Sequence, residues 1–451
     1  MKGTGQQLRW WIVEDALRDR QGHWLEYLRT FQRGLAAEGD QVRFFASKEC
    51  VPEVADVFKA EPVLPKSIWA RMSDGAPKWR RLLRIPAHGL ATYRAISKLL
   101  ADCPPPHAPG FSPTRRSDEP EGMLPAGRPM PDLIFVPTVL VHHLVGWVLL
   151  IKRKLRNLPC QVLLFFPNAP VIMSENGVAR LLPDPTAKLF RICIRSLAKE
   201  VHEGKVILGA ETRSMVKALG EVAGVPFTYL PHPVELSETK APVTRHPVGR
   251  LGDPSPQTPV PATLDNPVVF GCYGAARYEK GSDVLQAAIR KVLETRPDVP
   301  AHFVFQWLED FSDAAGVPCR LDPWLCEHPK VHVLENLFPE GGYERQLGGT
   351  DVMILPYRSA YRLRVSRVVI EAMNLGIPVI ATRGTTLCEQ AKEFGVVKAC
   401  EEGSPDDLVR AIFSVMQNFK GSWAAAQAQI EASRSHFSVA EFRQRMLAAN
   451  H

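Results

Sequence analysis

The chain has 451 residues, a net charge of +7 and an apolar fraction of 45%, which excludes a small disulfide-stapled scaffold, a largely disordered chain and a polytopic membrane protein. At roughly 100–200 residues per domain, this length allows two or three domains. Its 39 prolines exceed the usual share of about 5%, and 18 of them lie in two short stretches, 104–131 and 231–267.

The positive charge is also localised. Residues 1–236 contain 32 Lys and Arg against 23 Asp and Glu, whereas residues 237–451 contain 23 against 25. The segment 66–98 alone has eight basic residues and one acidic residue, interleaved with Trp69, Trp79 and Tyr93. Two interpretations stay open: a helix with its apolar side packed inward, or a segment lying on an anionic membrane surface. Charge alone would also permit nucleic-acid binding, which we do not expect.

The nine cysteines form no Cys-x-x-Cys pair and have no zinc-ligand spacing, so we expect free thiols in a reducing compartment, the cytoplasm. The first twenty residues contain an apolar run of only four residues, too short for a signal-peptide core. Residues 133–151 approach the length of a membrane span but contain Pro137, His142 and His143, and a buried strand followed by a core helix is the better explanation. We interpret the two histidines as a hydrogen-bonded pair in that helix, and expect no metal site.

Taken in chain order, the first sixty residues predict a strand at 8–13, a helix from Trp24 and a strand at 42–46. The same alternation returns with strands at 133–137, 162–166 and 206–208, and restarts with strands at 268–273, 302–307, 331–334, 351–355 and 378–381. Strands separated by helices predict parallel sheets covered on both faces.

We therefore predict an α/β fold with two Rossmann-like domains facing each other across a cleft. The first spans 1–236, carries a Pro-rich insertion at about 103–131 and is completed by a C-terminal helix at about 430–451. A linker at 237–266 leads to the second domain, 267–429. In such sheets ligands bind at the carboxyl ends of the strands, so the candidate residues are those that directly follow strands.

The loop after the strand at 268–273 contains Gly274, Arg277, Lys280 and Gly281. Its two cations, three residues apart in a Gly-bracketed turn, could bind one anionic group such as a diphosphate. On spacing alone a solvated basic loop is an equal alternative, and the glycines do not form a dinucleotide fingerprint.

Two further loops follow strands of the second domain. Ser366 is placed to cap a helix that carries Glu371, and Arg364 just before it makes this helix N-terminus a candidate anion site. Glu371 could accept hydrogen bonds from vicinal hydroxyls such as those of ribose, although a solvated Glu would fit the spacing as well. Thr385 and Thr386, after the strand at 378–381, suit phosphate or sugar contacts but also suit an ordinary turn.

Three blocks of sequence resemble retaining GT-B fold glycosyltransferases of the family-4 type, the glycosyl transferases group 1. The blocks are 277–281 (Arg-Tyr-Glu-Lys-Gly), 351–357 (Asp-Val-Met-Ile-Leu-Pro-Tyr) and 366–382, which is the most specific. Gly22-His23 and the stretch 230–234 fit the same family more loosely. The resemblance implies that Arg277 and Lys280 are catalytic residues holding the diphosphate of a UDP- or GDP-sugar, and that Glu371 binds the ribose. It also implies a donor contact for Gly22 and no metal or other cofactor.

Two positions depart from the family pattern. The family usually has a second Glu eight residues before the one matching Glu371, where this chain has Leu363. It often has a His after a first-domain strand, where this chain has Pro167 and Asn168. His23 and Asn168 are therefore the candidate contacts to the sugar or the acceptor.

The function that this resemblance implies is transfer of a sugar, with retention of configuration, to a cell-envelope glycan or a lipid-linked acceptor. The basic segment 66–98 fits an enzyme working in the cytoplasm at the inner face of the membrane. Two alternatives remain: a nucleotide-sugar epimerase of the same fold, and a non-catalytic GT-B-like binding module.

Overall fold

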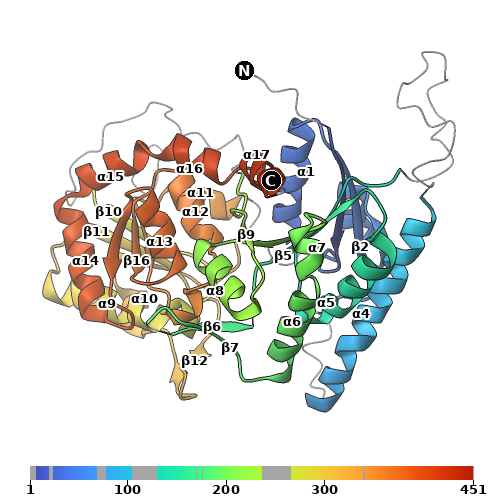
Figure 1. The fold of residues 1–451 in the computed structure, drawn as a ribbon. Coiled ribbons are helices and arrows are strands. Elements are labelled where there is room, and N and C mark those ends of the chain that lie inside the picture. The colour runs from blue at the N-terminus through green and yellow to red at the C-terminus, as the bar shows by residue number, and fades with distance from the viewer. Residues whose placement is uncertain are drawn as a thin grey trace. The chain divides into compact units, whose positions relative to one another are not determined.

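The computed structural model describes residues 7–19, 24–68, 78–103, 129–168, 170–174, 176–235, 266–338 and 341–449, without the side chains of residues 78–82 (Figure 1). The chain forms two compact units, 1–233 together with 439–451, and 234–438. The expected insertion at 103–131 and linker at 237–266 lie almost wholly outside the described residues.

Unit 1 is built on a parallel seven-stranded sheet with the order β3-β2-β1-β4-β5-β8-β9. The central strands β1 and β5 are buried along almost their whole length, which parallel strands covered on both faces require. The strands are β1 (Arg9–Glu14), β2 (Gln41–Ser47), β3 (Glu61–Leu64), β4 (Leu133–Val136), β5 (Gln161–Phe166), β8 (Val206–Ala210) and β9 (Thr228–Tyr229).

The helices of unit 1 pack their apolar faces on this sheet. They are α1 (Trp24–Ala37), α2 (Pro52–Phe58), α4 (Lys78–Ala101), α5 (Val141–Leu150) with a π-helical continuation η1 (Ile151–Leu155), α6 (Pro185–Ser196), α7 (Ala198–His202), α8 (Arg213–Ala223) and α17 (Val439–Ala448). A short hairpin of β6 (Val171–Met173) and β7 (Ala179–Leu181) lies outside the sheet. Although α17 is distant in sequence, its Phe442 ring lies 4.9 Å from that of Phe31 and 5.6 Å from that of Phe135, in the middle of the unit 1 core.

Unit 2 is built on a parallel six-stranded sheet with the order β14-β11-β10-β15-β16-β17. Its strands are β10 (Val268–Cys272), β11 (Ala301–Gln306), β14 (Val331–Leu334), β15 (Val352–Leu355), β16 (Val379–Thr382) and β17 (Val397–Cys400), with a separate hairpin of β12 (Phe311–Ser312) and β13 (Pro318–Cys319). Two apolar clusters fill the space between this sheet and the helices that cover it.

The helices of unit 2 include two short 3₁₀ turns at strand ends, η2 (Tyr278–Lys280) and η3 (Ser359–Tyr361). The α-helices are α9 (Ser282–Thr295), α10 (Pro323–Glu327), α11 (Gly342–Gly348), α12 (Arg367–Asn374), α13 (Thr386–Glu393), α14 (Pro405–Gln417), α15 (Phe419–Gln427) and α16 (Ile430–His436).

Every strand expected from the sequence forms within a few residues of its expected bounds. The apolar stretch 133–151 becomes the buried strand β4 and the helix α5, as expected, and within the described residues no helix is long and apolar enough to cross a bilayer. All nine cysteines are free.

The basic segment is partly visible as α4, which packs against α5. Ile85, Ile96 and Leu99 face the interior, whereas Leu83 and Leu90 are exposed. The interpretation of a helix with one apolar side packed inward therefore holds for residues 83–100.

Candidate functional site

The carboxyl end of β10 carries Lys280 folded back over the strand end. Gly274 has φ +95°, and a Cβ on it would lie 2.5 Å from the Lys280 Nζ. The same glycine donates its N–H to the Gln306 Oε1 at 2.9 Å, and the Lys280 Nζ lies 5.8 Å from the centre of the Tyr357 ring. Burial lowers the pKa of Lys280, because the charged ammonium is partly desolvated. A Cβ at 274 would require the Lys280 ammonium group to move, and the positive φ also favours glycine there.

Arg277, the second expected cation, lies just before η2 and is exposed. Its guanidinium is 3.8 Å from the Glu279 carboxylate, and it acts electrostatically, together with Arg364, on the Tyr361 hydroxyl. The structure thus brings one half-buried cation and two exposed ones to the same edge of the unit 2 sheet.

The loops that follow β10 and β15 are held tightly together. A Cβ on Gly281 would lie 2.0 Å from the Pro356 carbonyl oxygen, so only glycine permits this approach of the two backbones. Arg358 forms two hydrogen bonds of 2.7 Å to the Asp283 carboxylate, and its guanidinium stacks 3.9 Å from the centre of the Tyr278 ring. These contacts fix the turn that carries Lys280.

Glu371 lies in α12 and is only 3% exposed. One carboxylate oxygen accepts a hydrogen bond of 2.8 Å from the Arg367 Nε, and the other accepts one from the Tyr343 hydroxyl of α11. Burial, and then the nearby Glu371 charge, hold the pKa of Tyr343 well above its ordinary value. Because a carboxylate offers about four acceptor positions, Glu371 can accept further hydrogen bonds while both contacts persist.

Ser366 occupies the N-cap position of α12, but its side chain makes no capping hydrogen bond. The expected side-chain cap is therefore wrong, because the hydroxyl of Ser366 lies beside that of the buried Tyr357 instead. The first turn of α12 receives no acceptor from its N-cap side chain, and such N–H groups favour anions.

The two threonines after β16 are buried and already have partners. Thr385 caps α13 by accepting from the Cys388 N–H at 3.3 Å. Thr386 donates to the backbone carbonyls of Tyr361 (3.1 Å) and Arg364. These bonds hold the loop 361–364 in place. The donor-binding role expected of the two threonines stays a prediction. Leu363 is buried while Arg364 is exposed, so the side chain this loop presents to solvent is basic.

In unit 1, Gly22 and His23 lie outside the described residues, and Asn168 is exposed two residues beyond β5. Their sugar or acceptor contacts remain predictions. Further titratable groups, buried or half-buried, lie at the carboxyl edge of the unit 1 sheet. The His232 Nδ1 lies 2.8 Å from the Glu211 carboxylate, and the Tyr27 ring stacks on His232 at 4.6 Å.

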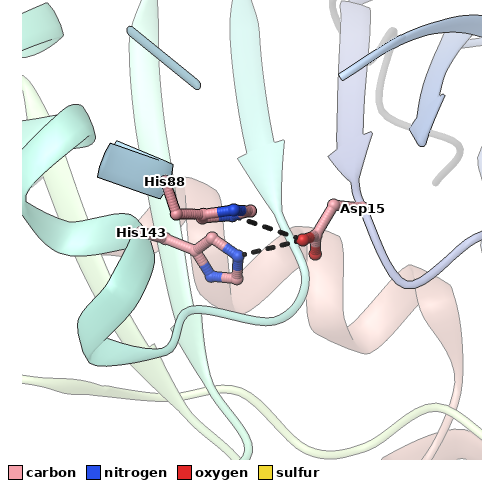
Figure 2. A group of neighbouring side chains, drawn as sticks. All are labelled: Asp15, His88 and His143. Carbon is pink, nitrogen blue, oxygen red and sulfur yellow. Dashed lines mark ion pairs between the residues drawn. The ribbon is translucent and has the colours of Figure 1, made fainter. Parts of the chain in front are cut away.

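A second group at this edge comes from β1 and two helices (Figure 2). Glu14 ends β1 and Asp15 follows it, and the imidazoles of His88 (α4) and His143 (α5) are directed at the Asp15 carboxylate. Burial and the adjacent Asp15 raise the pKa of Glu14 to about 8. His143 is hydrogen-bonded, as expected, through the Leu140 N–H, but its partner residues are Asp15 and His88 rather than His142.

Residues 267–418 match the sequence model of the family described as Glycosyl transferases group 1. This part of the chain is a glycosyl transferases group 1 domain. It contains the strands β10, β11 and β14 to β17 and every candidate donor residue of unit 2. The chain accordingly contains a glycosyltransferase domain of group 1, a class that uses nucleotide-sugar donors.

Solved structures share the fold of the whole chain, not only of the group 1 domain. A glycosyltransferase from Rickettsia africae ESF-5 has 13% identity over 99% of this chain and 98% of its own, with a TM-score of 0.59. Anabaena HepE in complex with UDP-glucose has 12% identity over 98% of this chain and 99% of its own, with a TM-score of 0.55.

A putative UDP-N-acetylglucosamine 2-epimerase from Listeria monocytogenes has 14% identity over 98% of this chain and 96% of its own, with a TM-score of 0.51. At these identities the likeness shows the fold alone, which confirms the predicted GT-B class with two parallel α/β sheets. No curated protein sequence matches the chain.

The donor-side residues that sequence reasoning missed are contributed by neighbouring strands and helices. Tyr343 and Gln306 hold Glu371 and Gly274 from α11 and the end of β11. Gln306 could have been noticed as a polar residue closing an otherwise apolar strand. Tyr343 had no signal in the sequence, because it lies 28 residues before Glu371 with no motif between them.

Proposed function

We propose that the chain transfers a sugar from a nucleoside diphosphate sugar to a glycan or lipid-linked acceptor of the cell envelope, with retention of the anomeric configuration. The observation that carries the proposal is the half-buried ammonium of Lys280, which occupies the space beside Gly274 where a Cβ would lie. A partly desolvated cation fixed at the carboxyl edge of a parallel sheet is suited to a diphosphate.

The proposed chemistry places negative charge on the leaving diphosphate. Lys280 and Arg277 neutralise that charge, and the N-terminus of α12 adds its uncapped N–H groups. Glu371, oriented by Arg367 and Tyr343, accepts the ribose hydroxyls through its remaining lone pairs. Asn168, Gly22 and His23 are the proposed contacts of unit 1 with the sugar, the phosphates and the acceptor. No side chain is required as a nucleophile.

An epimerase of the same fold is the second candidate, since a putative 2-epimerase is among the proteins with this fold. Such an enzyme needs acid and base groups converging on the sugar, and the loop that would supply one on the donor side has Leu363 and Arg364. The group 1 match favours transfer over epimerisation, and also over a non-catalytic binding module.

The donor class is tested by calorimetric titration of the full chain with UDP and with GDP, followed by donor-hydrolysis and transfer assays over a panel of UDP- and GDP-sugars. We expect one nucleotide to bind and one of its sugars to turn over. Nucleotide binding without hydrolysis or transfer of any donor sugar would favour the binding module. A C2-epimerised product formed without acceptor would favour the epimerase.

Variants of the two central residues refine this test. Lys280→Ala should lower turnover by about 10²–10³-fold, the usual effect of removing one group that stabilises developing charge. For Glu371 the substitution should be Gln, because Ala would leave the buried Tyr343 and Arg367 donors without an acceptor. Glu371→Gln should weaken nucleotide binding while circular dichroism stays unchanged, and unaltered binding would contradict the ribose role.

The membrane part of the proposal rests on the exposed side of α4. Arg94 and Lys98 are exposed there, and the eight basic residues and one acidic residue of the segment 66–98 give it a net charge of +7, equal to that of the whole chain. The full chain should co-sediment with vesicles containing phosphatidylglycerol and dissociate at high salt. The variant Arg94→Glu/Lys98→Glu should weaken this binding, whereas Lys420→Glu, an exposed lysine of unit 2, should not. Equal binding to neutral vesicles would contradict an electrostatic contact.

A further inference from the structure

Three buried side chains from separate parts of unit 1 meet at the end of β1 (Figure 2). Asp15 follows the strand, His88 comes from α4 and His143 from the first turn of α5. Their exposed fractions are 6%, 1% and 4%. One potential ligand atom of each lies within 4.8 Å of the others, so one small ion could contact all three.

The Asp15 carboxylate forms ion pairs with both imidazoles and accepts the Ile68 N–H at 3.3 Å, and its distances to the imidazoles also match those between ligands of one ion. The Asp15 Oδ2 lies 3.4 Å from the His88 Nε2 and 3.3 Å from the His143 Nε2. An N–H···O hydrogen bond is about 2.7–3.2 Å long. By contrast, tetrahedral ligands 2.0–2.1 Å from zinc are about 3.3–3.4 Å apart. The carboxylate oxygen therefore stands at the spacing that a shared ion would impose.

The hydrogen bonding of the two imidazoles is also incomplete. Within the described residues, neither ring nitrogen of His88 has a hydrogen-bond partner, and neither does the His143 Nε2. Buried polar atoms are nearly always paired, because an unpaired one loses its hydration without compensation. A cation bound by both Nε2 atoms would replace the hydration that these two atoms lose on burial.

A second carboxyl group lies beside the cluster. Glu14 is 2% exposed; its Oε1 accepts the Ala16 N–H at 2.9 Å, and its Oε2 has no partner among the described residues. No Lys or Arg of the described part of the chain pairs with Glu14 or Asp15. Glu14, Asp15 and His143 line a cavity of about 10 Å³, roughly the space of one water molecule.

We propose that Asp15, His88 and His143 bind one divalent cation of the zinc type, with a fourth ligand supplied from the adjoining cavity. One carboxylate and two imidazoles are a usual ligand set for this ion. The ion joins the end of β1 to α4 and α5 and fixes the basic helix to its domain. This site is independent of the glycosyl transfer proposed above, which requires no metal.

Binding changes the tautomer of His143. Its Nδ1 accepts the Leu140 N–H at 3.1 Å, which leaves the proton on the Nε2 that faces Asp15. When the ion takes the place of that proton, the proton moves to Nδ1, which then gives up the hydrogen bond from the Leu140 N–H and donates to the Thr138 backbone instead. An acceptor behind a metal-bound imidazole orients the ring and strengthens its binding.

The test uses the full chain, purified without chelator and analysed for bound metals by mass spectrometry. It is then stripped with EDTA and reloaded with Zn²⁺ or Co²⁺ alone. We expect about one zinc per chain, visible d–d bands of tetrahedral Co²⁺, and a lower melting temperature after stripping. His88→Ala and His143→Ala should weaken zinc binding by at least about tenfold.

His142→Ala is the matched control, since His142 neighbours His143 in α5 and should leave zinc binding unchanged. The cobalt spectrum and the effect of EDTA use the unaltered chain, so they remain informative if a variant does not fold. A stripped chain that takes up no Zn²⁺ and melts at the same temperature with and without it would overturn the proposal. Loss of zinc from His142→Ala equal to the loss from His143→Ala would overturn the ligand assignment.

Discussion

At the scale of single residues, the proposed donor site depends on the contact between the position of Gly274 and the side chain of Lys280. Gly274 has a positive φ of +95°, and the Lys280 Nζ occupies the space that a Cβ on it would need. Gly403 has a similar positive φ of +70°, yet a Cβ there would meet nothing within 4 Å. Comparing Gly274 with Gly403 therefore separates the effect of a positive φ from the effect of a neighbouring side chain.

Gly274→Ala should therefore lower turnover by about 10²-fold or more, because the methyl group displaces the Lys280 ammonium from the diphosphate position. Gly403→Ala should cost about 1–2 kcal/mol of stability through backbone strain alone and leave turnover unchanged. Donor hydrolysis measured at saturating nucleotide-sugar, with thermal melts of both variants, checks the prediction. Equal turnover of the two variants would contradict it.

At the scale of elements, two contacts between segments hold candidate sites in place. In unit 2, Arg358 joins η2 to the loop after β15 through Asp283 and Tyr278. In unit 1, α4 and α5 cross so closely that a Cβ on Gly146 would lie 2.2 Å from the Gly89 carbonyl oxygen. His88 and His143 lie beside this crossing.

Arg358→Lys should lower kcat/KM by about tenfold to a hundredfold, because lysine cannot make the two-pronged contact with Asp283 and stack on Tyr278 together. Arg290 is the control: it also pairs with an aspartate, Asp322, and stacks on Trp324. Steady-state kinetics of Arg290→Lys should match the unaltered chain. An Arg358→Lys enzyme with normal kcat/KM would show that the turn is held by other contacts.

Gly146→Ala should destabilise unit 1 by about 1–3 kcal/mol, since the added methyl group separates two backbones in contact. Gly220→Ala in α8 has its nearest contact at 3.8 Å and should instead stabilise the protein by about 0.5–1 kcal/mol. Urea denaturation of both variants measures the difference. The same sign for both would contradict the close crossing.

At the scale of the whole molecule, unit 1 is completed by α17. Arg443 of this helix is hydrogen-bonded to Asp40 at 2.7 and 3.1 Å, and the Asp40 side chain is fully buried. Asp40 also accepts hydrogen bonds from the Leu8 N–H and the Trp10 indole. The pair thus connects α17 to the first strand of the chain.

Arg443→Met should lower the stability of unit 1 by about 3–5 kcal/mol, because it leaves a buried carboxylate without its cation. Adding Asp40→Asn should restore part of this loss. Arg445→Met, which removes a pair with Glu441 on the same helix, should cost less than about 1 kcal/mol. Calorimetry of the full chain checks whether only one of two unfolding transitions shifts; a shift of both by the same amount would contradict an effect confined to unit 1.

The sequence predicted most of the fold because parallel strands buried on both faces are continuous apolar runs, such as 162–166 and 351–355. It predicted Lys280 and Glu371 because they lie in local motifs beside strand ends. It did not reveal the roles of Tyr343 and Gln306, nor that the Ser366 side chain leaves the N-terminus of α12 uncapped. These features depend on side chains that meet from separate segments. Asp15, His88 and His143 were missed as a cluster for the same reason: zinc motifs are recognised by short spacings, and these residues come from three distant segments.

The place of α17 has a consequence for how the protein is made. During synthesis the whole of unit 2 emerges before the residues that complete unit 1. Unit 2 can therefore fold on the ribosome while the core around Phe135 still lacks Phe442, and unit 1 closes last although it begins first. Until then its unfilled core exposes apolar surface to chaperones and proteases. A nascent chain stalled before residue 439 should thus yield a protease-resistant fragment from unit 2 and none from unit 1.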